Sequence, residues 1–271
     1  MPTVERLTPE LVRVLAPNPS PMTLDGTNTY VLGAAGTGEV VIVDPGPDDP
    51  AHRQHVDDAV AELDAEVRAI AVTHHHPDHA EAAAGWAADL GCPVLAPTAY
   101  LAVDAPVITE GDRVALRNVE VTVIATPGHT RDHVAFRLGS GAVLTGDHVL
   151  GRGTSVVAHP DGDLQAYLDS LQRLYDLGPS ALHPGHGPSL TEDPGAVLSY
   201  YAEHRHYREL QLKHVLRDGP AGLGELVARL YADVDRRVWP AAAASLSALL
   251  AVLVARGEVH RDAAARYHLA V

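Results

Sequence analysis

Short apolar runs separated by turns containing glycine or proline recur along roughly the first two-thirds of the chain. Two of them, 28–33 and 40–46, flank the turn 34–38 and predict an opening hairpin. The second run is continuously apolar up to Asp44, which is typical of a buried strand. Further strands are predicted at 70–73, 94–95, 119–125 (after a hairpin turn around Arg117–Asn118), 133–138, 142–145 and 180–182.

Segments with a helical period lie between these runs. In 49–63, apolar residues recur on one face and acidic residues on the other, and the alanine-rich run 80–90 also predicts a helix. The amphipathic segment 164–174 is capped by Asp163 and ended by Gly178. The last part of the chain predicts helices at 193–217, 224–232 and 240–255, followed by a small hairpin at 258–261 and 266–269.

Composition limits the compartment and the class of protein. With 46% hydrophobic residues the chain can bury a sizeable core. The single cysteine, Cys92, excludes a disulfide within the chain and fits a reducing compartment. Residues 1–21 lack the apolar core of a secretion signal, so we expect a cytoplasmic protein. The longest apolar stretch, 241–255, is shorter than the roughly 18 residues that span a membrane, so no membrane-spanning helix is expected.

The net charge of −15 is unevenly distributed. Residues 1–200 hold 10 Arg against 27 Asp plus Glu, whereas residues 201–271 hold 10 Lys plus Arg against 8 acids. The first part, at −17, should repel phosphate backbones unless metals and local arginines intervene. The tail, at +2, is compatible with a nucleic acid.

The stretch 69–80 carries the densest chemistry, because the pattern His-x-His-x-Asp-His follows an apolar run. If 72–76 ends a strand, alternation puts His74 and His76 on one side. Asp78 and His79 then begin the next helix, where the helix dipole favours a carboxylate. Imidazole nitrogens and carboxylate oxygens suit zinc and similar divalent ions, so this segment predicts ligands for two adjacent metals.

Two metals need more ligands than one segment supplies, and later strand ends provide them. His129 follows 119–125, Asp147 follows 142–145 and His186 follows 180–182. Most of these residues stand beside glycine or proline, as expected for loops held by a rigid scaffold. Asp44, at the end of 40–46, is either a turn former or helix cap, or a carboxylate that steadies a metal-bound histidine.

The whole series resembles the metallo-beta-lactamase superfamily, in which this first motif is followed by a His, an Asp and a final His. Within that superfamily, four segments resemble the beta-lactamase-like protein 2 branch. They are Gly26-Thr27-Asn28-Thr29-Tyr30, Thr126-Pro127-Gly128-His129-Thr130, Gly146-Asp147 with Leu150-Gly151-Arg152-Gly153-Thr154, and Pro184-Gly185-His186-Gly187-Pro188. The resemblance implies an αββα sandwich with the site at one edge between its two sheets.

The resemblance also assigns the ligands of two divalent metal ions, with zinc as the default and iron or manganese as alternatives. The ligands are His74, His76 and His129 for the first metal, Asp78, His79 and His186 for the second, and Asp147 as the bridge. Other imidazoles near these motifs are expected to support the site or to be structural or exposed: His75, His133, His148 and His183.

We predict a catalytic domain at 1–192 and a winged-helix-like domain at 193–271, in keeping with the resemblance. Packing or dimerisation is the alternative role of this tail. The expected activity is hydrolysis of a small ester, thioester or lactone by a metal-activated water, with Asp78 orienting the nucleophile and moving a proton. Two alternatives stay open: an endoribonuclease on single-stranded RNA, marked by a basic track through Arg205, Arg208, Lys213 and Arg217, and a non-catalytic binding module on a metal-stabilised scaffold.

Overall fold

The computed structural model describes residues 1–117 and 119–270 and divides into two compact units. The first comprises 1–126, 132–153 and 178–194, and the second comprises 127–131, 154–177 and 195–271. The first unit holds 8 Arg against 23 acidic residues and therefore carries the net charge of −15, whereas the second holds 12 basic and 12 acidic residues. The domain boundary after residue 192 stays a prediction.

Six strands form the first sheet of the first unit, in the spatial order in which they occur in the sequence. They are β1 (Val4–Thr8), β2 (Leu11–Leu15), β3 (Asn28–Leu32), β4 (Glu39–Val43), β5 (Glu66–Ala71) and β6 (Val94–Leu95). β1 to β4 are antiparallel, whereas β4, β5 and β6 run parallel. Parallel neighbours need a crossover, and α1 (Pro50–Glu62) and α3 (Ala83–Leu90) supply helices for the two crossovers.

Five strands form the second sheet, in the order β11-β10-β9-β8-β7. They are β7 (Arg113–Val114), β8 (Val121–Ala125), β9 (Val134–Leu138), β10 (Val143–Gly146) and β11 (Leu182–Pro184). β10 and β11 run parallel and the other neighbouring pairs are antiparallel.

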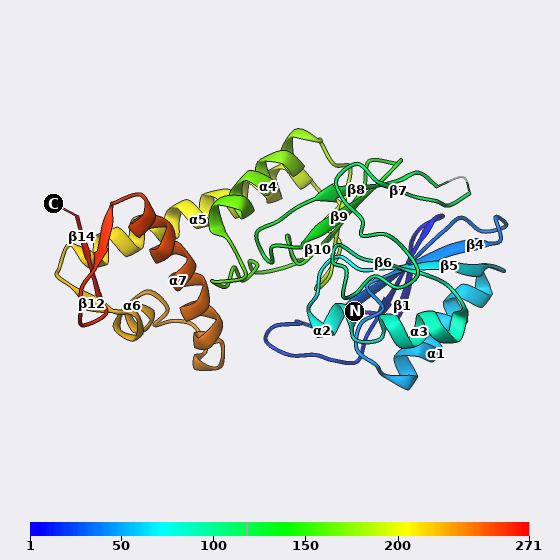
Figure 1. Ribbon diagram of the computed structural model, residues 1–271, viewed down its shortest axis with the longest axis horizontal. Coiled ribbons are helices and arrows are strands. Elements are labelled where there is room, and N and C mark those ends of the chain that lie inside the picture. Colours follow the sequence, from blue (N-terminus) through cyan, green and yellow to red (C-terminus); the bar gives the residue numbers. More distant parts are fainter. Residues whose placement is uncertain (118, 271) are drawn as a thin grey trace. The chain divides into compact units, whose positions relative to one another are not determined.

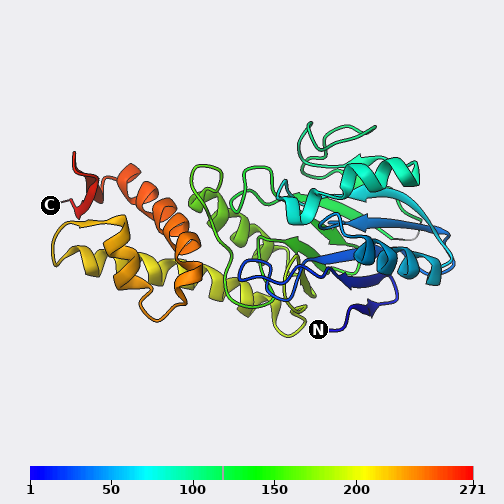
Figure 2. The same cartoon turned by 90° about the horizontal axis from the view of Figure 1, so that it is seen from below.

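Alternation along β4 shows how the first sheet is buried on both faces. Val40 and Ile42 pack in one apolar cluster with residues of α1 and α3, and Figures 1 and 2 show these helices against the sheet. Val41 and Val43 pack in the other cluster with residues of the second sheet, including Phe136. The continuous apolar run seen in the sequence is thus a central strand between a helix layer and a second sheet.

The second unit is mainly helical. Its helices are α4 (Leu164–Asp176), α5 (Pro194–Leu216, from its second residue), α6 (Leu223–Leu230), the short 3-10 helix η1 (Arg236–Val238) and α7 (Trp239–Ala255). A small sheet joins β12 (Ala221–Gly222), β14 (Arg266–Leu269) and β13 (Val259–Arg261) in that order. Asp163 caps α4 by accepting a hydrogen bond from the Ala166 amide, as the sequence predicted.

Two expectations need correction, and two strands were missed. The strand that feeds the histidine motif ends at Ala71, so 72–76 is a loop and not a strand end. The helix expected over 80–90 is divided into α2 (Pro77–Ala80) and α3. β1 and β2 were not predicted, and the predicted turn residue Asn118 lies outside the described residues.

One helical stretch is long and apolar enough to cross a membrane, since η1 and α7 together cover Arg236–Ala255 with a mean hydropathy of 2.0. The prediction that no helix spans a membrane considered only the shorter apolar segment 241–255. Leu246, Leu249, Leu250 and Leu253 of α7 are nevertheless buried inside the second unit. Of the most apolar 18-residue window in this stretch, 28% is buried inside the structure.

Candidate metal centre

The carboxylate of Asp44 forms hydrogen bonds with several residues at one edge of the first sheet. β4 and β5 are parallel neighbours, so the residues after them meet at the same edge. Asp44 is 2% exposed and has a left-handed φ of 52°. Its Oδ1 accepts a hydrogen bond from the Thr73 amide at 2.7 Å and its Oδ2 accepts one from the Thr73 hydroxyl at 2.8 Å. Of its two readings from sequence, the geometry favours the carboxylate that supports a histidine, because Oδ2 also lies 2.9 Å from His79 Nδ1.

Four of the expected ligands converge at this edge. His79 Nε2 lies 3.2 Å from His186 Nε2 and 3.3 Å from Asp147 Oδ1. His186 Nε2 lies 3.2 Å from Asp78 Oδ2 and 3.3 Å from Asp147 Oδ1. Ligand atoms about 2.0–2.1 Å from a tetrahedral zinc ion lie about 3.3–3.4 Å from one another. The spacing of these atoms therefore fits a divalent ion between them.

A second group lies beside the first. His74, His76 and Asp147 offer ligand atoms within 4.8 Å of one another, and His74 Nε2 is 3.0 Å from His76 Nδ1. Although 72–76 is a loop, the two imidazoles face each other as the alternation argument expected. His75 points elsewhere and its Nδ1 lies 2.9 Å from Asp132 Oδ1.

Hydrogen bonds on the far side of each ring fix which nitrogen points toward the cluster. The single hydroxyl proton of Thr73 goes to Asp44, so His74 Nδ1, at 3.0 Å from that hydroxyl oxygen, must be the donor. His79 Nδ1 donates to Asp44, and His186 Nδ1 donates to the Gly26 carbonyl at 3.2 Å. With those protons on Nδ1, Nε2 of each ring faces the cluster and is the nitrogen that would bind a metal once it is deprotonated.

The electrostatics of the cluster favour positive charge at its centre. Burial opposes ionisation of Asp147, but His186 and His79 hold its pKa well below the usual range. Burial would lower the pKa of His186, yet the Asp147 carboxylate raises it to about 9. The pKa of His79 is also raised well above 6.5, because Asp147 and Asp44 outweigh its burial. Buried carboxylates and imidazoles in this arrangement suit a cation with nitrogen and oxygen ligands.

His129 belongs to the second compact unit. It lies in the loop before α4, 8% exposed, and its Nδ1 is 2.6 Å from the Val156 carbonyl, to which it donates. That bond leaves Nε2 as the nitrogen that would bind a metal, as in the other rings. Its role as a ligand of the first metal stays a prediction.

The remaining expected support residues have separate surroundings. The Asp147 amide lies 3.2 Å from His133 Nε2, and Thr126 Oγ1 lies 2.8 Å from His133 Nδ1. His148 is fully buried with its ring centroid 5.8 Å from that of His133. His183 pairs instead with Ser189 Oγ at 2.8 Å, and burial lowers its pKa to about 4.

Sequence reasoning assigned no role to the residues that hold the loop of His186. The Asn28 side chain donates to the carbonyls of Pro184 and Gly187, each at 2.8 Å. A Cβ atom at Gly185 would lie 2.6 Å from His79 Cε1 and 2.8 Å from Asp147 Oδ1. The glycines of the last motif were the available signal for Gly185, because glycine marks close approach of backbone to other groups.

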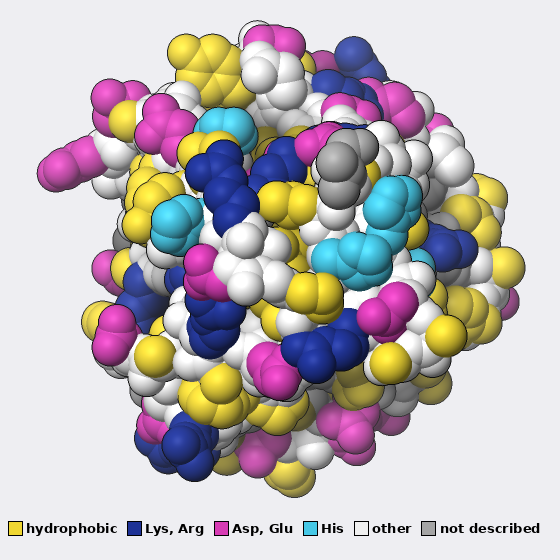
Figure 3. Space-filling model, turned by 90° about the vertical axis from the view of Figure 1, so that its left-hand side faces the viewer, with side chains coloured by type: hydrophobic (Ala, Val, Ile, Leu, Met, Phe, Trp, Pro, Cys, Tyr) yellow, Lys and Arg dark blue, Asp and Glu magenta, His cyan; other side chains and the backbone are white. Residues whose placement is uncertain are grey.

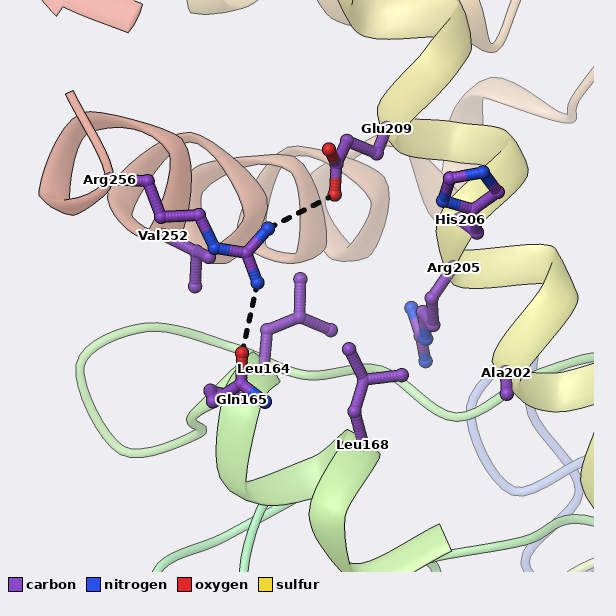
Figure 4. A pocket seen from close by; sticks show the side chains of 9 residues that line it. All are labelled: Leu164, Gln165, Leu168, Ala202, Arg205, His206, Glu209, Val252 and Arg256. Carbon is purple, nitrogen blue, oxygen red and sulfur yellow. Dashed lines mark hydrogen bonds and ion pairs between the residues drawn. The ribbon is translucent and has the colours of Figure 1, made fainter. Parts of the chain in front are cut away.

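A cavity of about 190 Å³ in the second unit offers no comparable chemistry. Figure 4 shows Arg256 on its wall, bound to Glu209 at 3.5 Å and to Gln165 at 2.9 Å. Arg205, also on the wall, donates to the Ser155 carbonyl at 2.5 Å and lies over the Tyr167 ring. Its cations are therefore engaged within the fold, and the histidine and aspartate cluster is the candidate site.

Comparison with family models agrees with this assignment. Residues 22–104 and 96–186 match the model described as the metallo-beta-lactamase superfamily, and residues 223–266 match the beta-lactamase associated winged helix domain. Among solved structures, a metallo-beta-lactamase family protein from Thermus thermophilus superposes with a TM-score of 0.81 at 27% identity, over 98% of this chain and 100% of that one.

Two curated relatives are similar along most of the chain. The beta-lactamase-like protein 2 homolog of Drosophila melanogaster is 31% identical, covering 96% of this chain and 92% of its own length. The atrochrysone carboxyl ACP thioesterase of Aspergillus chevalieri is 35% identical, covering 84% of this chain and 74% of its own length. The resemblance stated from the sequence motifs is thereby confirmed.

Proposed function

The chain belongs to the metallo-beta-lactamase superfamily of hydrolases, and we propose that it hydrolyses a small thioester, ester or lactone at a centre of two divalent metal ions. The observation that carries the proposal is the convergence of Asp78, His79, His186 and Asp147. The two histidine Nε2 atoms lie 3.2 Å from each other and 3.2–3.8 Å from the nearest oxygens of the two carboxylates. His74, His76 and His129 are the proposed ligands of the first metal, as the sequence predicted, and Asp78, His79 and His186 are those of the second.

Bound there, a pair of divalent ions supplies a Lewis acid and a water whose pKa is lowered to near neutrality. Zinc is the proposed default for these nitrogen and oxygen donors, and iron or manganese suits the same set. The bridging role proposed for Asp147 fits its position between the two groups.

Asp78 is the proposed proton acceptor. Its side chain is 30% exposed, whereas those of His79 and His186 are closed to solvent, so of these three ligands it is the one that a substrate can reach. It orients the attacking water and then carries the proton to the leaving group. His133, by accepting from the Asp147 amide, holds that carboxylate in place.

The thioester is favoured as substrate because several relatives carry that activity in their names. The Aspergillus chevalieri protein and a homologue of the same name from Aspergillus fumigatus, 32% identical, are both called atrochrysone carboxyl ACP thioesterases. Their similarity supports acyl transfer to water as the reaction class, and the acyl group of this chain's substrate is left open.

The basic track that would favour RNA is weakly supported. Arg205 is only 9% exposed, Arg208 donates to Gln211 and to the Leu230 carbonyl, and Lys213 pairs with Glu209 and Glu258 at 2.5 Å each. Figure 3 shows basic and acidic side chains interspersed on the face it displays. Charges already paired within the fold give little attraction to a phosphate backbone. Arg217, the fourth residue of the track, is exposed, so RNA is kept as the second candidate.

A substrate panel tests the proposal. Metal-loaded protein is assayed with hexanoyl-N-acetylcysteamine, a lactone, bis(p-nitrophenyl) phosphate and single-stranded RNA, each with the Asp147→Ala variant in parallel. We expect thioester hydrolysis that falls by about 100-fold or more in the variant. Turnover confined to RNA, or thioester cleavage equal in both proteins, would contradict the assignment.

A further inference from the structure

A buried chain of hydrogen bonds runs from the Asp44 turn into α1. The Thr29 hydroxyl lies 2.7 Å from the Asp44 carbonyl oxygen, and His52 Nε2 lies 2.8 Å from the same hydroxyl. Thr29 and His52 are both 0% exposed. Neither contributes to the metal ligands, and neither is needed by the proposed reaction steps.

The direction of each bond follows from the chemistry of the groups. A carbonyl oxygen can only accept, so the single hydroxyl proton of Thr29 goes to Asp44. His52 Nε2 must therefore carry a proton and donate it to the Thr29 oxygen. Burial lowers the pKa of His52 to about 4, which agrees with a neutral ring holding one proton.

The Asp44 turn needs such support. Its φ of 52° places an aspartate in the left-handed region, which is unfavourable for a residue with a side chain. The same residue must direct its carboxylate at His79 and Thr73, and through Thr73 it also fixes the ring of His74. A small rotation of this turn would misdirect ligands of both metal positions.

His52 is itself held firmly by two helices. Its amide donates to Asp49 Oδ1, the N-cap of α1, at 2.8 Å. Its ring lies 5.9 Å from that of Trp86 on α3. The outer helix layer thus provides a rigid anchor for the far end of the chain.

We propose that Thr29 and His52 are positioning residues of the metal centre, which fix the Asp44 turn so that its carboxylate orients His79 directly and His74 through Thr73. The inference rests on the proposed function only in that the wild-type protein must bind metal. Mutation of residues that support metal ligands through hydrogen bonds typically lowers metal affinity by about 10–100-fold.

The test compares Thr29→Val, Thr29→Ser and His52→Phe in the full chain. Zinc affinity is measured by competition with a chromophoric chelator, and the ligand field is followed in the visible spectrum of the cobalt-substituted proteins. We expect Thr29→Val and His52→Phe to weaken binding by about 10-fold or more and to alter the cobalt bands. Thr29→Ser, which keeps the hydroxyl, should bind within about threefold of wild type.

Val56→Ala is the matched control, because Val56 is buried on α1 but takes no part in the hydrogen bonds described. It should lower the stability of the metal-free protein and leave zinc affinity unchanged. Wild-type affinity in Thr29→Val, equal losses in the Ser and Val variants, or an equal loss in Val56→Ala would each overturn the proposal. A wild-type protein that binds no metal would instead refute the proposed function itself.

Discussion

The imidazoles of His79 and His186 face each other with their Nε2 atoms 3.2 Å apart, although 107 positions separate them in the sequence. Each ring donates its Nδ1 proton backwards, His79 to Asp44 and His186 to the Gly26 carbonyl. At this distance the repulsion between two nitrogen lone pairs is removed either by a proton on one of the nitrogens or by a metal ion between them. Metal binding and local order should therefore be linked.

Removing the shared carboxylate tests that link. Asp147→Ala is expected to reduce zinc content by about one ion or more per chain and to lower hydrolysis by about 100-fold or more, since it leaves His79 and His186 without their common partner. Elemental analysis and initial rates measure the two effects. Asp176→Ala, which removes an exposed carboxylate that accepts from Gln172, should change neither quantity. Full metal content with normal turnover in Asp147→Ala would exclude the bridging role.

A methyl group added at Gly185 should also disrupt the centre, without removing any ligand. Its Cβ would lie 2.6 Å from His79 Cε1 and 2.8 Å from Asp147 Oδ1, closer than atoms can pack. We expect Gly185→Ala to weaken zinc binding by about 10-fold or more, measured by chelator competition.

Gly85 provides the control for that substitution. It is exposed on α3, and nothing lies within 4 Å of the position that a Cβ would take. Because glycine is a poor helix former, Gly85→Ala should stabilise the protein by about 0.5–1 kcal/mol in urea denaturation and leave metal affinity alone. Wild-type zinc affinity in Gly185→Ala would mean that the loop carrying His186 can shift to accommodate the added methyl group.

The features that could be predicted from the sequence are those that depend on residue type and on the direction of each strand. The run 40–46 is apolar at every position up to Asp44 because Val40 and Ile42 face helices while Val41 and Val43 face the other sheet. Asp147 and His186 could be recognised together because they follow β10 and β11, which are parallel neighbours whose ends meet at one edge of the second sheet. The short spacing of His74, His76, Asp78 and His79 made this part of the cluster recognisable from the sequence.

What the sequence did not reveal depends on contacts between distant segments. β1 and β2 carry arginines and glutamate among their apolar residues, and Arg13 is 2% exposed because it pairs with Glu5 across the strands. Thr73 and Asn28 act through hydrogen bonds to residues far along the chain, which periodicity cannot show. The end of β5 at Ala71 was misplaced because the apolar pattern continues for one more residue.

Asp78→Asn separates metal binding from proton transfer. An amide oxygen can still face the metal, but the side chain can no longer take up a proton. We expect kcat to fall by about 100-fold or more, with zinc content reduced far less than in Asp147→Ala. Asp57→Asn, a change on α1 where the carboxylate pairs with Arg53, serves as the control. A kcat close to wild type in Asp78→Asn would transfer the proton step to another group.

His183 should make the protein sensitive to acid, because burial lowers the pKa of its imidazole to about 4 while the unfolded chain keeps the ordinary value near 6.5. Between about pH 6.5 and pH 4 the unfolded state therefore binds a proton that the folded state does not, and stability falls as the pH falls through this window. The full loss from this group is of the order of 3 kcal/mol. His183→Gln removes the titration, so the difference in unfolding free energy between about pH 7 and pH 4.5, measured in urea, should be smaller than in wild type. Equal pH dependence in the two proteins would show that the folded chain accepts the proton at His183 without strain.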